Sequence, residues 1–322
     1  MSRRDDMAAQ IGALLDGSVP PDAAISWLKT HELERISAEE LTGAVDAVMA
    51  RCVPFPEFPE ALDCCGTGGD GLHTFNISTA SAFVVAARGV MIAKHGNRAV
   101  TSKSGSADVL EALGVNTAVG PLRTAEILNE VGIAFLFAPV FHPGFANVAM
   151  ARKAVGKRTI FNLLGPLCNP ARVRRQLIGT FAPEYAALMA EAAQLLGRDQ
   201  VMVVHGDDGT DELSITGITH VSQLQNGQIS YAALRPQDAG LTPQPGIALT
   251  GGDAHQNAKA LRDVLGGAPG PYADAVALNA AAVLMLAGRA QTLADGVTLA
   301  RGTMARGAAL EKLEQLIEAS HA

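Results

Sequence analysis

The chain has few cysteines, and none has the spacing of a metal-binding or redox motif. Its 322 residues include four cysteines and no C-x-x-C pattern; the four are Cys52, Cys64, Cys65 and Cys168. Cys64 and Cys65 lie inside a short apolar run. We therefore expect small buried side chains in a protein of the reducing cytoplasm, rather than disulfides or a metal or redox centre.

The chain also lacks an excess of positive charge and any apolar run long enough to cross a bilayer. Its net charge of −7 disfavours nucleic acid or an anionic membrane as the main partner, although a local basic pocket remains compatible with it. The most apolar segment, 275–287, is interrupted by Asn279 and is too short to span a bilayer. No apolar stretch follows the arginines near the start, so no signal peptide is expected.

Acidic residues are absent from one long internal stretch. None occurs between Asp70 and Asp108, yet this stretch contains four cations, Arg88, Lys94, Arg98 and Lys103. A glycine cluster at 66–71 precedes it, and the sequence N-I-S-T at 76–79 and a hydroxyl-rich loop at 101–106 lie within it. Glycines expose backbone N–H groups, a helix start attracts anions, and cations hold them. The stretch therefore predicts a phosphate site.

The same glycines also match the G-x-G-x-x-G pattern of a dinucleotide-binding loop, from Gly66 to Gly71. Such a loop needs a helix that begins within the glycines and an acidic residue about 20 positions later to hold the ribose. Here the helix-starting residues come later, and the second apolar run leads to Lys94 and His95 instead of a carboxylate. No G-K-[ST] follows, which excludes a Walker A loop. The pattern favours a phosphate site of another kind.

A cluster of acidic residues follows a later apolar run, 201–205. The four acids of the turn are Asp207, Asp208, Asp211 and Glu212. Carboxylates at the end of a strand suit Mg²⁺, which commonly uses one or two of them together with substrate phosphates. A solvated acidic turn would show the same pattern, so the residues alone leave both interpretations open.

Residues 1–60 are predicted to be helical. Prolines at 20–21 begin one helix, and Ser37 with Glu40 forms a capping-box pattern at the start of another. That second helix carries an apolar stripe at a spacing of four, Leu41, Val45 and Met49. Prolines within 54–59 form a linker. These helices are too few to bury their own faces, so they pack either on the rest of the chain or on a second copy.

From residue 61 onward, short apolar runs alternate with helical patterns. The expected strands are 61–65, 90–93, 133–138, 176–181 and 201–205. The expected helices are 78–87, 107–113, 124–131, 183–196, 252–265 and 273–287. A hairpin is expected at 219–234, around Asn226-Gly227. Such alternation predicts an α/β domain with a mainly parallel central sheet.

Several segments, taken together and in order, resemble one family. These are GTGGDG, NIST, KHGNR, SGSAD-LEALGV, FAPVFHP, RKAVGKRTIFNLLGPLCNP, VVHGDDGTDELS and GGDAHQNAKALRDVL, and they lie between residue 61 and the C-terminus. They are similar to those of anthranilate phosphoribosyltransferases of tryptophan biosynthesis. The resemblance implies a small N-terminal helical domain that makes a homodimer, residues 1–60 joined by part of 159–175. It also implies a larger α/β domain, 61–322, with the active site in the cleft between the two.

The resemblance further implies a set of substrate and metal contacts. Those for phosphoribosyl pyrophosphate, the donor, are Gly66, Gly69, Asp70, Thr74, Asn76, Ile77, Ser78, Thr79, Lys94, His95, Gly96, Asn97, Arg98, Ser102 and Ser106. Those for anthranilate, the acceptor, are Gly66, Asn97 and Arg152, with His142 as a further candidate. Those for Mg²⁺ are Ser78, Asp211 and Glu212. Arg158 is the nearest competitor of Arg152 for the carboxylate of the acceptor.

The implied reaction transfers a phosphoribosyl group to the amine of anthranilate and releases pyrophosphate. An aromatic amine is neutral and nucleophilic at pH 7, so we expect positioning and electrostatics without an obligatory general base. Two alternatives share the fold: a pyrimidine-nucleoside phosphorylase, and a nucleic-acid-binding paralogue without transferase activity. The KHGNR and NIST segments favour the transferase over the first, and the Asp211-Glu212 pair with the negative net charge favours it over the second.

Overall fold

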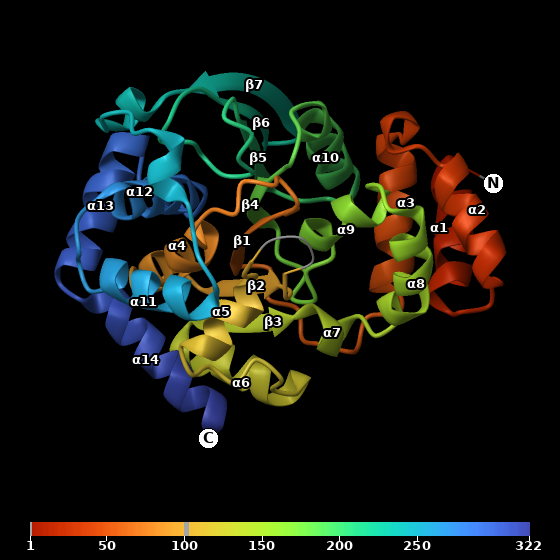
Figure 1. Ribbon diagram of the computed structural model, residues 1–322, viewed down its shortest axis with the longest axis horizontal. Helices are drawn as coiled ribbons and strands as arrows, with labels where there is room; N and C mark the ends of the chain where they lie inside the picture. The colour runs from red at the N-terminus through yellow and green to blue at the C-terminus, as the bar shows by residue number, and fades with distance from the viewer. Residues whose placement is uncertain (1, 100–102) are drawn as a thin grey trace.

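A mixed sheet forms the centre of the computed structural model, which describes residues 2–99 and 103–322 (Figure 1). Within these residues the sheet has seven strands, and their spatial order is β3 (Ile133–Phe137), β2 (Ile92–Gly96), β1 (Leu62–Gly66), β4 (Arg175–Gly179), β5 (Gln200–Gly206), β6 (Thr219–Gln225) and β7 (Gln228–Leu234). The strands from β3 to β5 are parallel, and β6 and β7 are antiparallel additions. The expected α/β class with a mainly parallel sheet is therefore confirmed.

The hairpin that ends the sheet forms at the expected place. Asn226 and Gly227 join β6 to β7, and both have positive φ angles, 51° and 72°. Two consecutive residues with positive φ match the right-handed twist of the flanking strands, which is why Asn-Gly is favoured at such turns.

Helices cover both faces of the sheet, and the alternation of side chains along the strands divides the core in two. In β4, Leu177 belongs to one hydrophobic cluster and Ile178 to the other. In β5, Met202 and Val204 likewise face the first cluster, whereas Val201 and Val203 face the second. Neighbouring residues of a strand point to opposite faces, so one sheet supports both clusters.

The first cluster contains residues from eight helices that pack on one face of the sheet or on one another. They are α4 (Ile77–Ala86), α5 (Ser106–Ala112), α6 (Pro121–Val131), α7 (Ala138–Phe141), α11 (Ala254–Leu265), α12 (Pro271–Leu286), α13 (Leu293–Ala305) and α14 (Ala308–His321). Short 3-10 turns, η2 (Pro236–Ala239) and η3 (Gly246–Leu249), lead from β7 into α11. Buried α12 carries Asn279, whose amide bonds the backbone of Leu213 in both directions. The polar residue that interrupts this apolar helix thus anchors the acidic turn.

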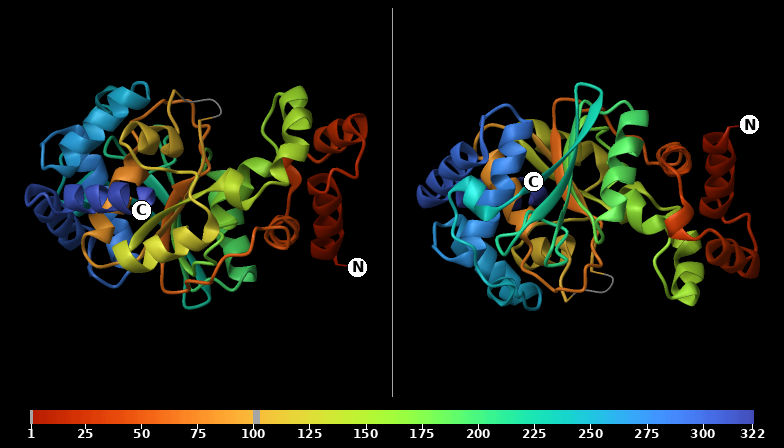
Figure 2. Two further views of the ribbon diagram at one scale, coloured as in Figure 1. Left: turned by 90° about the horizontal axis from the view of Figure 1, so that it is seen from below. Right: turned by 90° about the horizontal axis from the view of Figure 1, so that it is seen from above.

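The second cluster joins the N-terminal helices to the other face of the sheet. It contains α1 (Arg3–Leu15), α2 (Pro21–Thr30), η1 (Leu33–Arg35), α3 (Ala38–Met49), α8 (Phe145–Val155), α9 (Phe161–Leu167) and α10 (Glu184–Leu195). Figure 2 shows the first helices, in red, at one end of the molecule and the C-terminal helices, in blue, at the other. None of the helices within 2–99 and 103–322 is both long and apolar enough to cross a membrane.

The apolar stripe of α3 packs within this chain. Leu41 and Val45 are buried in the second cluster, and Met49 packs partly buried against it. Ser37 and Glu40 form the expected capping box at the start of this helix. The sequence left open whether the stripe packs on the rest of the chain or on a second copy. The structure shows that it packs on the rest of the chain, so it is not a free surface for a second copy.

Candidate active site

Four parallel strands end in glycine at one edge of the sheet. Gly66, Gly96, Gly179 and Gly206 are the last residues of β1, β2, β4 and β5. A Cβ on Gly66 would lie 2.2 Å from Asp211 Oδ2, and one on Gly179 would lie 1.5 Å from the Asp211 carbonyl oxygen. The absent side chains let the acidic turn lie directly against the strand ends, where ligands bind in parallel α/β sheets.

The glycine loop that follows β1 is held to its neighbours by hydrogen bonds of Thr67. The Thr67 N–H donates to the Gly179 carbonyl at 2.9 Å, and the Thr67 hydroxyl accepts from Phe181 N–H at 3.0 Å. Gly68, Gly69 and Gly71 all have positive φ. Among the described residues, the N–H groups of Gly69, Asp70 and Gly71 donate to no protein acceptor. Consecutive unpaired N–H groups in such a loop form a concavity for an anion.

Asp211 and Glu212 meet the glycine loop and the start of α4. Asp211 Oδ2 accepts the Gly68 N–H at 2.8 Å, and Glu212 Oε1 accepts the Ser78 N–H at 3.1 Å. Burial, followed by the nearby Asp70, raises the pKa of Asp211 to about 6. Burial, followed by Asp211, raises the pKa of Glu212 to about 8, although Lys94 opposes the shift. Asp207 instead pairs with His220 at 2.6 Å, half exposed, as expected for a solvated acid.

These carboxylates suit a magnesium ion. No group of three His, Cys, Asp or Glu side chains in the described part of the chain is arranged to hold a metal by itself. Mg²⁺ does not need such a cage, because one or two carboxylates with water and substrate phosphates suffice. Asp70 Oδ2 is buried beside Asp211 without a hydrogen-bond partner. Acidic groups gathered in this way are stabilised by a cation.

The raised pKa of Glu212 gives the metal-free protein a pH-dependent stability. Between about pH 4.5 and about pH 8, Glu212 keeps a proton in the folded protein that it releases in the unfolded chain. The contribution of this proton to the free energy of unfolding is therefore present at low pH and lost as pH rises. We expect the free energy of unfolding in EDTA to fall over this window. Mg²⁺, which competes with that proton, should raise the melting temperature more at pH 8 than at pH 5.5.

Melting curves of the wild type and of Glu212→Gln, with EDTA or Mg²⁺, measure this effect. The variant should show a weaker pH dependence, since it has no carboxyl to titrate. A wild-type Mg²⁺ response of equal size at both pH values would contradict the expectation.

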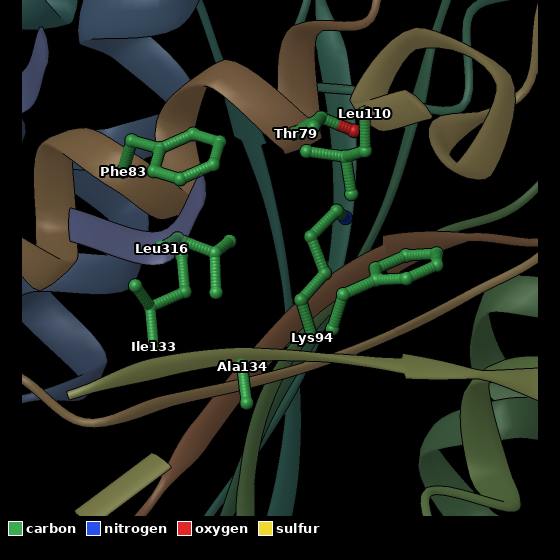
Figure 3. Close-up of a pocket in the computed structure, with 8 residues that line it drawn as sticks. Thr79, Phe83, Lys94, Leu110, Ile133, Ala134 and Leu316 are labelled. Atoms are coloured by element: carbon green, nitrogen blue, oxygen red, sulfur yellow. The ribbon is translucent and has the colours of Figure 1, made fainter. Parts of the chain in front are cut away.

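Lys94 supplies the buried positive charge of the site. It lies in β2 at 3% exposure, and its Nζ donates to the Cys64 carbonyl at 2.6 Å and to the Ser78 hydroxyl at 3.3 Å. Figure 3 shows its side chain rising from the sheet toward Thr79 at the start of α4. Together with Phe83 and Leu316 of α14, these residues line a small cavity behind the site. Lys94 therefore joins β1, β2 and α4 at one charged point.

Asn76 precedes α4 without capping it through its side chain. The helix begins at Ile77, and the side chain of Asn76 makes no capping hydrogen bond. Its amide instead joins Ser104 and Asn257, with Nδ2 donating to the Ser104 carbonyl and Oδ1 accepting from Asn257 Nδ2. Sequence reasoning missed Asn257, although it lies in the segment GGDAHQN, where a buried asparagine follows a helix cap.

The segment after β2 folds back on itself. The Ser106 hydroxyl and the Ala107 N–H both donate to the Asn97 carbonyl. The Arg98 guanidinium turns to Glu111, with two hydrogen bonds of 2.7 Å, and to Asp108, and the Arg98 N–H donates to Asn97 Oδ1 at 2.8 Å. The expected contact Ser102 lies outside the described residues. His95 is buried, and its Nδ1 lies 3.0 Å from the Gly165 carbonyl.

The remaining expected donor residues line the same strand end and helix start. Gly66 ends β1, Gly69 and Asp70 belong to the glycine loop, and Thr74 pairs with Thr250 in an isolated antiparallel bridge. Ile77, Ser78 and Thr79 form the first turn of α4, where Ile77 and Thr79 are buried. Gly96 ends β2, where a Cβ would lie 2.3 Å from the Ser106 hydroxyl.

Arg152 and Arg158 occupy different surroundings. The guanidinium of Arg152, on α8, lies 5.5 Å over the ring of Phe161, and burial lowers its pKa. Within the described residues it forms no ion pair or hydrogen bond. The guanidinium of Arg158 lies 4.0 Å over Phe181 and donates from Nη2 to the Gly69 carbonyl, so it contacts the glycine loop.

A row of rings leads from the end of β2 to Arg152. His95 and His142 lie 5.2 Å apart between ring centroids, His142 and Phe145 6.0 Å, and Phe145 and Phe161 5.7 Å. Burial lowers the pKa of His95 to about 3 and that of His142 to about 4, so both rings are neutral at pH 7. A row of neutral rings that ends at a cation is chemically suited to a flat ring with a carboxylate.

Comparisons with known proteins identify the family. A model described as a glycosyl transferase family, a/b domain, matches residues 59–310. An anthranilate phosphoribosyltransferase of Rhodopseudomonas palustris (strain TIE-1) is 46% identical over 99% of this chain and 94% of its own length. A crystal structure of anthranilate phosphoribosyltransferase from Thermus thermophilus is 42% identical, with a TM-score of 0.93 over 99% of this chain and 96% of that one.

The Saccharomyces cerevisiae anthranilate phosphoribosyltransferase is also similar. Its structure in complex with PRPP and Mg is 30% identical with a TM-score of 0.88, covering 99% of this chain and 92% of that one. Its structure in complex with 4-fluoroanthranilate is 28% identical with a TM-score of 0.88, covering 99% of this chain and 93% of that one. Sequence and fold thus agree over almost the whole length, and the chain belongs to the anthranilate phosphoribosyltransferase family.

Proposed function

We propose that this chain transfers the phosphoribosyl group of phosphoribosyl pyrophosphate to the amine of anthranilate. The products are N-(5-phosphoribosyl)anthranilate and pyrophosphate, a step of tryptophan biosynthesis. The observation that carries the proposal is the meeting of Asp211, Glu212 and Lys94 with the glycine loop and the start of α4. The relatives named for this reaction, including one bound to PRPP and Mg, support it. Neither the phosphorylase nor the nucleic-acid-binding alternative has such support.

In the proposed donor site, cations and N–H groups hold the departing pyrophosphate. The unpaired N–H groups of the glycine loop and the positive end of the α4 helix dipole favour an anion, and Lys94 adds a buried charge. Asp211 and Glu212 would hold Mg²⁺, with Ser78 at a second ion. Mg²⁺, when bound, neutralises charge that develops on the leaving pyrophosphate. We assign the donor contacts given above to this site; of these, Arg98 has its guanidinium paired with Glu111 and its N–H with Asn97 Oδ1, so a ligand would have to displace one of these partners.

In the proposed acceptor site, Arg152 binds the carboxylate of anthranilate at the end of the ring row, and Gly66 and Asn97 lie nearer the reacting amine. A partly buried guanidinium without an anion of its own favours an anionic ligand. The C–O bond from ribose to pyrophosphate breaks, the amine nitrogen bonds to the ribose carbon, and the amine then releases a proton to water. No residue need act as a strong base, since the amine is already neutral.

The direct test mixes the protein with phosphoribosyl pyrophosphate, Mg²⁺ and anthranilate. Anthranilate is fluorescent, and its signal should disappear only when all three are present. Unchanged fluorescence in the complete mixture, with the protein folded, would refute the proposed function. Retention on heparin in its place would favour the nucleic-acid-binding paralogue.

We also propose a cytoplasmic homodimer with two domains, residues 1–60 joined by part of 159–175, and residues 61–322. The four cysteines are free, as in a reducing compartment. α9 packs with α3 in the second cluster, which supports its place beside the N-terminal helices. The stripe of α3 is not available for the dimer, and exposed Met150 on α8 lies on a surface that α1 and α2 adjoin.

Light scattering is expected to give a mass of about 67 kDa at micromolar concentration, twice the 33.3 kDa of one chain. Met150→Asp should reduce this mass toward that of a monomer, because it would bury a charge in the interface. Leu122→Asp is the matched control, since Leu122 is similarly exposed on α6, at a distance from the N-terminal helices. A monomeric wild type would rule the dimer out.

A further inference from the structure

The segment between η3 and α11 is bonded to the segment that precedes α4. The Gly251 N–H donates to the His73 carbonyl at 2.8 Å, and the Phe75 N–H donates to the Leu249 carbonyl at 2.9 Å. A Cβ on Gly251 would lie 2.8 Å from the Thr74 carbonyl oxygen, so this approach requires glycine. Residues 73–76 are thus held in place by residues 249–251, far away in the sequence.

Asn257 extends this contact through side chains. It is 3% exposed in the first turn of α11. Its Oδ1 accepts the Gly252 N–H at 2.7 Å, and its Nδ2 donates to Asn76 Oδ1 at 3.0 Å. Asn76 Nδ2 in turn donates to the Ser104 carbonyl at 3.3 Å. A line of amide hydrogen bonds therefore runs from α11 through the start of α4 to the hydroxyl-rich loop.

This line explains why Asn76 makes no helix cap. The oxygen and the nitrogen of its amide are hydrogen-bonded to two other segments, those of Asn257 and Ser104. Both segments adjoin the place assigned to phosphate. If Asn257 is lost, Asn76 Oδ1 loses its donor and the amide can rotate away from Ser104. Buried amides are fixed only when each partner is present, so the line acts as a unit.

We propose that Asn257 is a positioning residue of the donor site, which fixes Asn76 and through it the loop that contains Ser104. This inference rests on the proposed function, because it concerns the binding of phosphoribosyl pyrophosphate. Asn257 does not itself touch the substrate. Its loss should weaken the binding of phosphoribosyl pyrophosphate and leave the KM for anthranilate unchanged. A general loss of stability would not affect one substrate alone.

The test compares Asn257→Asp, Asn257→Ala and Gln256→Ala with the wild type. Asn257→Asp keeps the size of the side chain and the acceptor for Gly252 but places a second oxygen against Asn76. Gln256→Ala is the control, because Gln256 caps the same helix by bonding Asp253 and has no contact with Asn76. Melting curves establish that each variant is folded.

Calorimetric titration with phosphoribosyl pyrophosphate and Mg²⁺ should show roughly tenfold weaker binding in both Asn257 variants, the cost of an unpaired buried amide. The KM for phosphoribosyl pyrophosphate should rise in parallel, while the KM for anthranilate stays within about twofold, because the side-chain hydrogen bonds of Asn257 and Asn76 reach none of the residues assigned to the acceptor. Gln256→Ala should bind the donor like the wild type. Donor binding equal to wild type in the folded Asn257 variants would overturn the proposal, and so would equal losses for both substrates.

A double-mutant cycle tests whether Asn257 acts through Asn76. In an Asn76→Ala background, Asn257→Ala should weaken donor binding by less than about twofold further, since its partner is already absent. Fully additive losses would mean that Asn257 acts by another route and would refute the inference alone. A wild type that fails to bind phosphoribosyl pyrophosphate would refute the proposed function, and this inference with it.

Discussion

Asp211→Ala combined with Glu212→Ala is expected to abolish transfer while the protein remains folded. The two carboxylates lie at the meeting point of the glycine loop and α4, where Gly68 and Ser78 donate to them. Without them only Asp70 and Ser78 would remain to hold a cation against the pyrophosphate, and the charge on the leaving group would be poorly neutralised. Because both acids are costly to bury, the double variant should not unfold more readily in EDTA than the wild type.

Turnover from the loss of anthranilate fluorescence, measured across a range of Mg²⁺ concentrations, checks this result. Asp211→Asn with Glu212→Gln is the isosteric counterpart, which keeps the volume and removes the charge. Asp207→Ala is the matched control, since Asp207 belongs to the same turn but pairs at the surface with His220. Near-normal rates in the folded double variant at ordinary Mg²⁺ would show that the metal assignment is wrong.

Arg152→Ala is expected to lower acceptor efficiency by roughly ten- to a hundredfold, the loss of about 1.5–3 kcal/mol from a charged hydrogen bond. The donor site cannot select anthranilate, because it is built for phosphate and ribose. Selection needs a separate cation that reads a carboxylate, and a guanidinium does so with two parallel bonds. Arg152 stands over Phe161 with no anion among its described neighbours, so it is available for that carboxylate.

Arg158 provides the comparison, and its surroundings predict a different result. Its guanidinium contacts the Gly69 carbonyl and the face of Phe181, so Arg158→Ala should disturb the glycine loop and raise the KM for phosphoribosyl pyrophosphate. Steady-state kinetics that vary each substrate in turn separate the two arginines. A lower kcat/KM for anthranilate in Arg152→Ala, with an unchanged KM for phosphoribosyl pyrophosphate, would support the assignment. Equal losses for both substrates in that variant, or anthranilate losses only in Arg158→Ala, would move the carboxylate site elsewhere.

The apolar runs in the sequence correctly predicted all five parallel strands. They misplaced the C-terminal end of β2, which carries residues of the candidate site. The run at 90–93 predicted a strand that stops before Lys94, whereas β2 continues to Gly96. A lysine and a histidine inside a buried strand are unfavourable until carbonyl oxygens satisfy them, and those partners come from β1 and α9. A single run of sequence carries no sign of such distant partners.

The helices at the end of the chain show a second limit, because the expected elements include neither α13 nor α14. In α13, Gly296 and Gly302 lower helix propensity. A Cβ on Gly296 would lie 2.6 Å from that of Ala281 in α12, so this glycine allows the two helices to pack closely. α14, by contrast, has apolar residues at helical spacing, among them Leu313 and Leu316, and that periodicity is a signal by which the helix could have been found.

The candidate site also contains residues that the sequence indicated and residues that only the structure revealed. Glycines, cations and acids marked the segments that carry charge, and the structure brings the glycine loop, Lys94 and the Asp211-Glu212 pair together by hydrogen bonds. Asn257 and Arg158 contact Asn76 and Gly69, and neither contact leaves a pattern in local sequence. Residues that bind ligands have a recognisable chemistry, whereas residues that position them are recognisable only by what they touch.

The long sequence separations of these contacts determine when the phosphate site can form during synthesis. Gly68 and Asp211 are 143 residues apart, and Asn76 and Asn257 are 181 residues apart. A nascent chain that has just completed β4 already carries its glycine loop and the residues Gly179, Arg158 and Lys94 that contact this loop or the start of α4, but it still lacks Asp211 and Asn257. Closing such long loops is slow and unfavourable until the last partner arrives. Substrate can therefore stabilise only the finished chain, and a fragment ending before α11 should gain no protection from it.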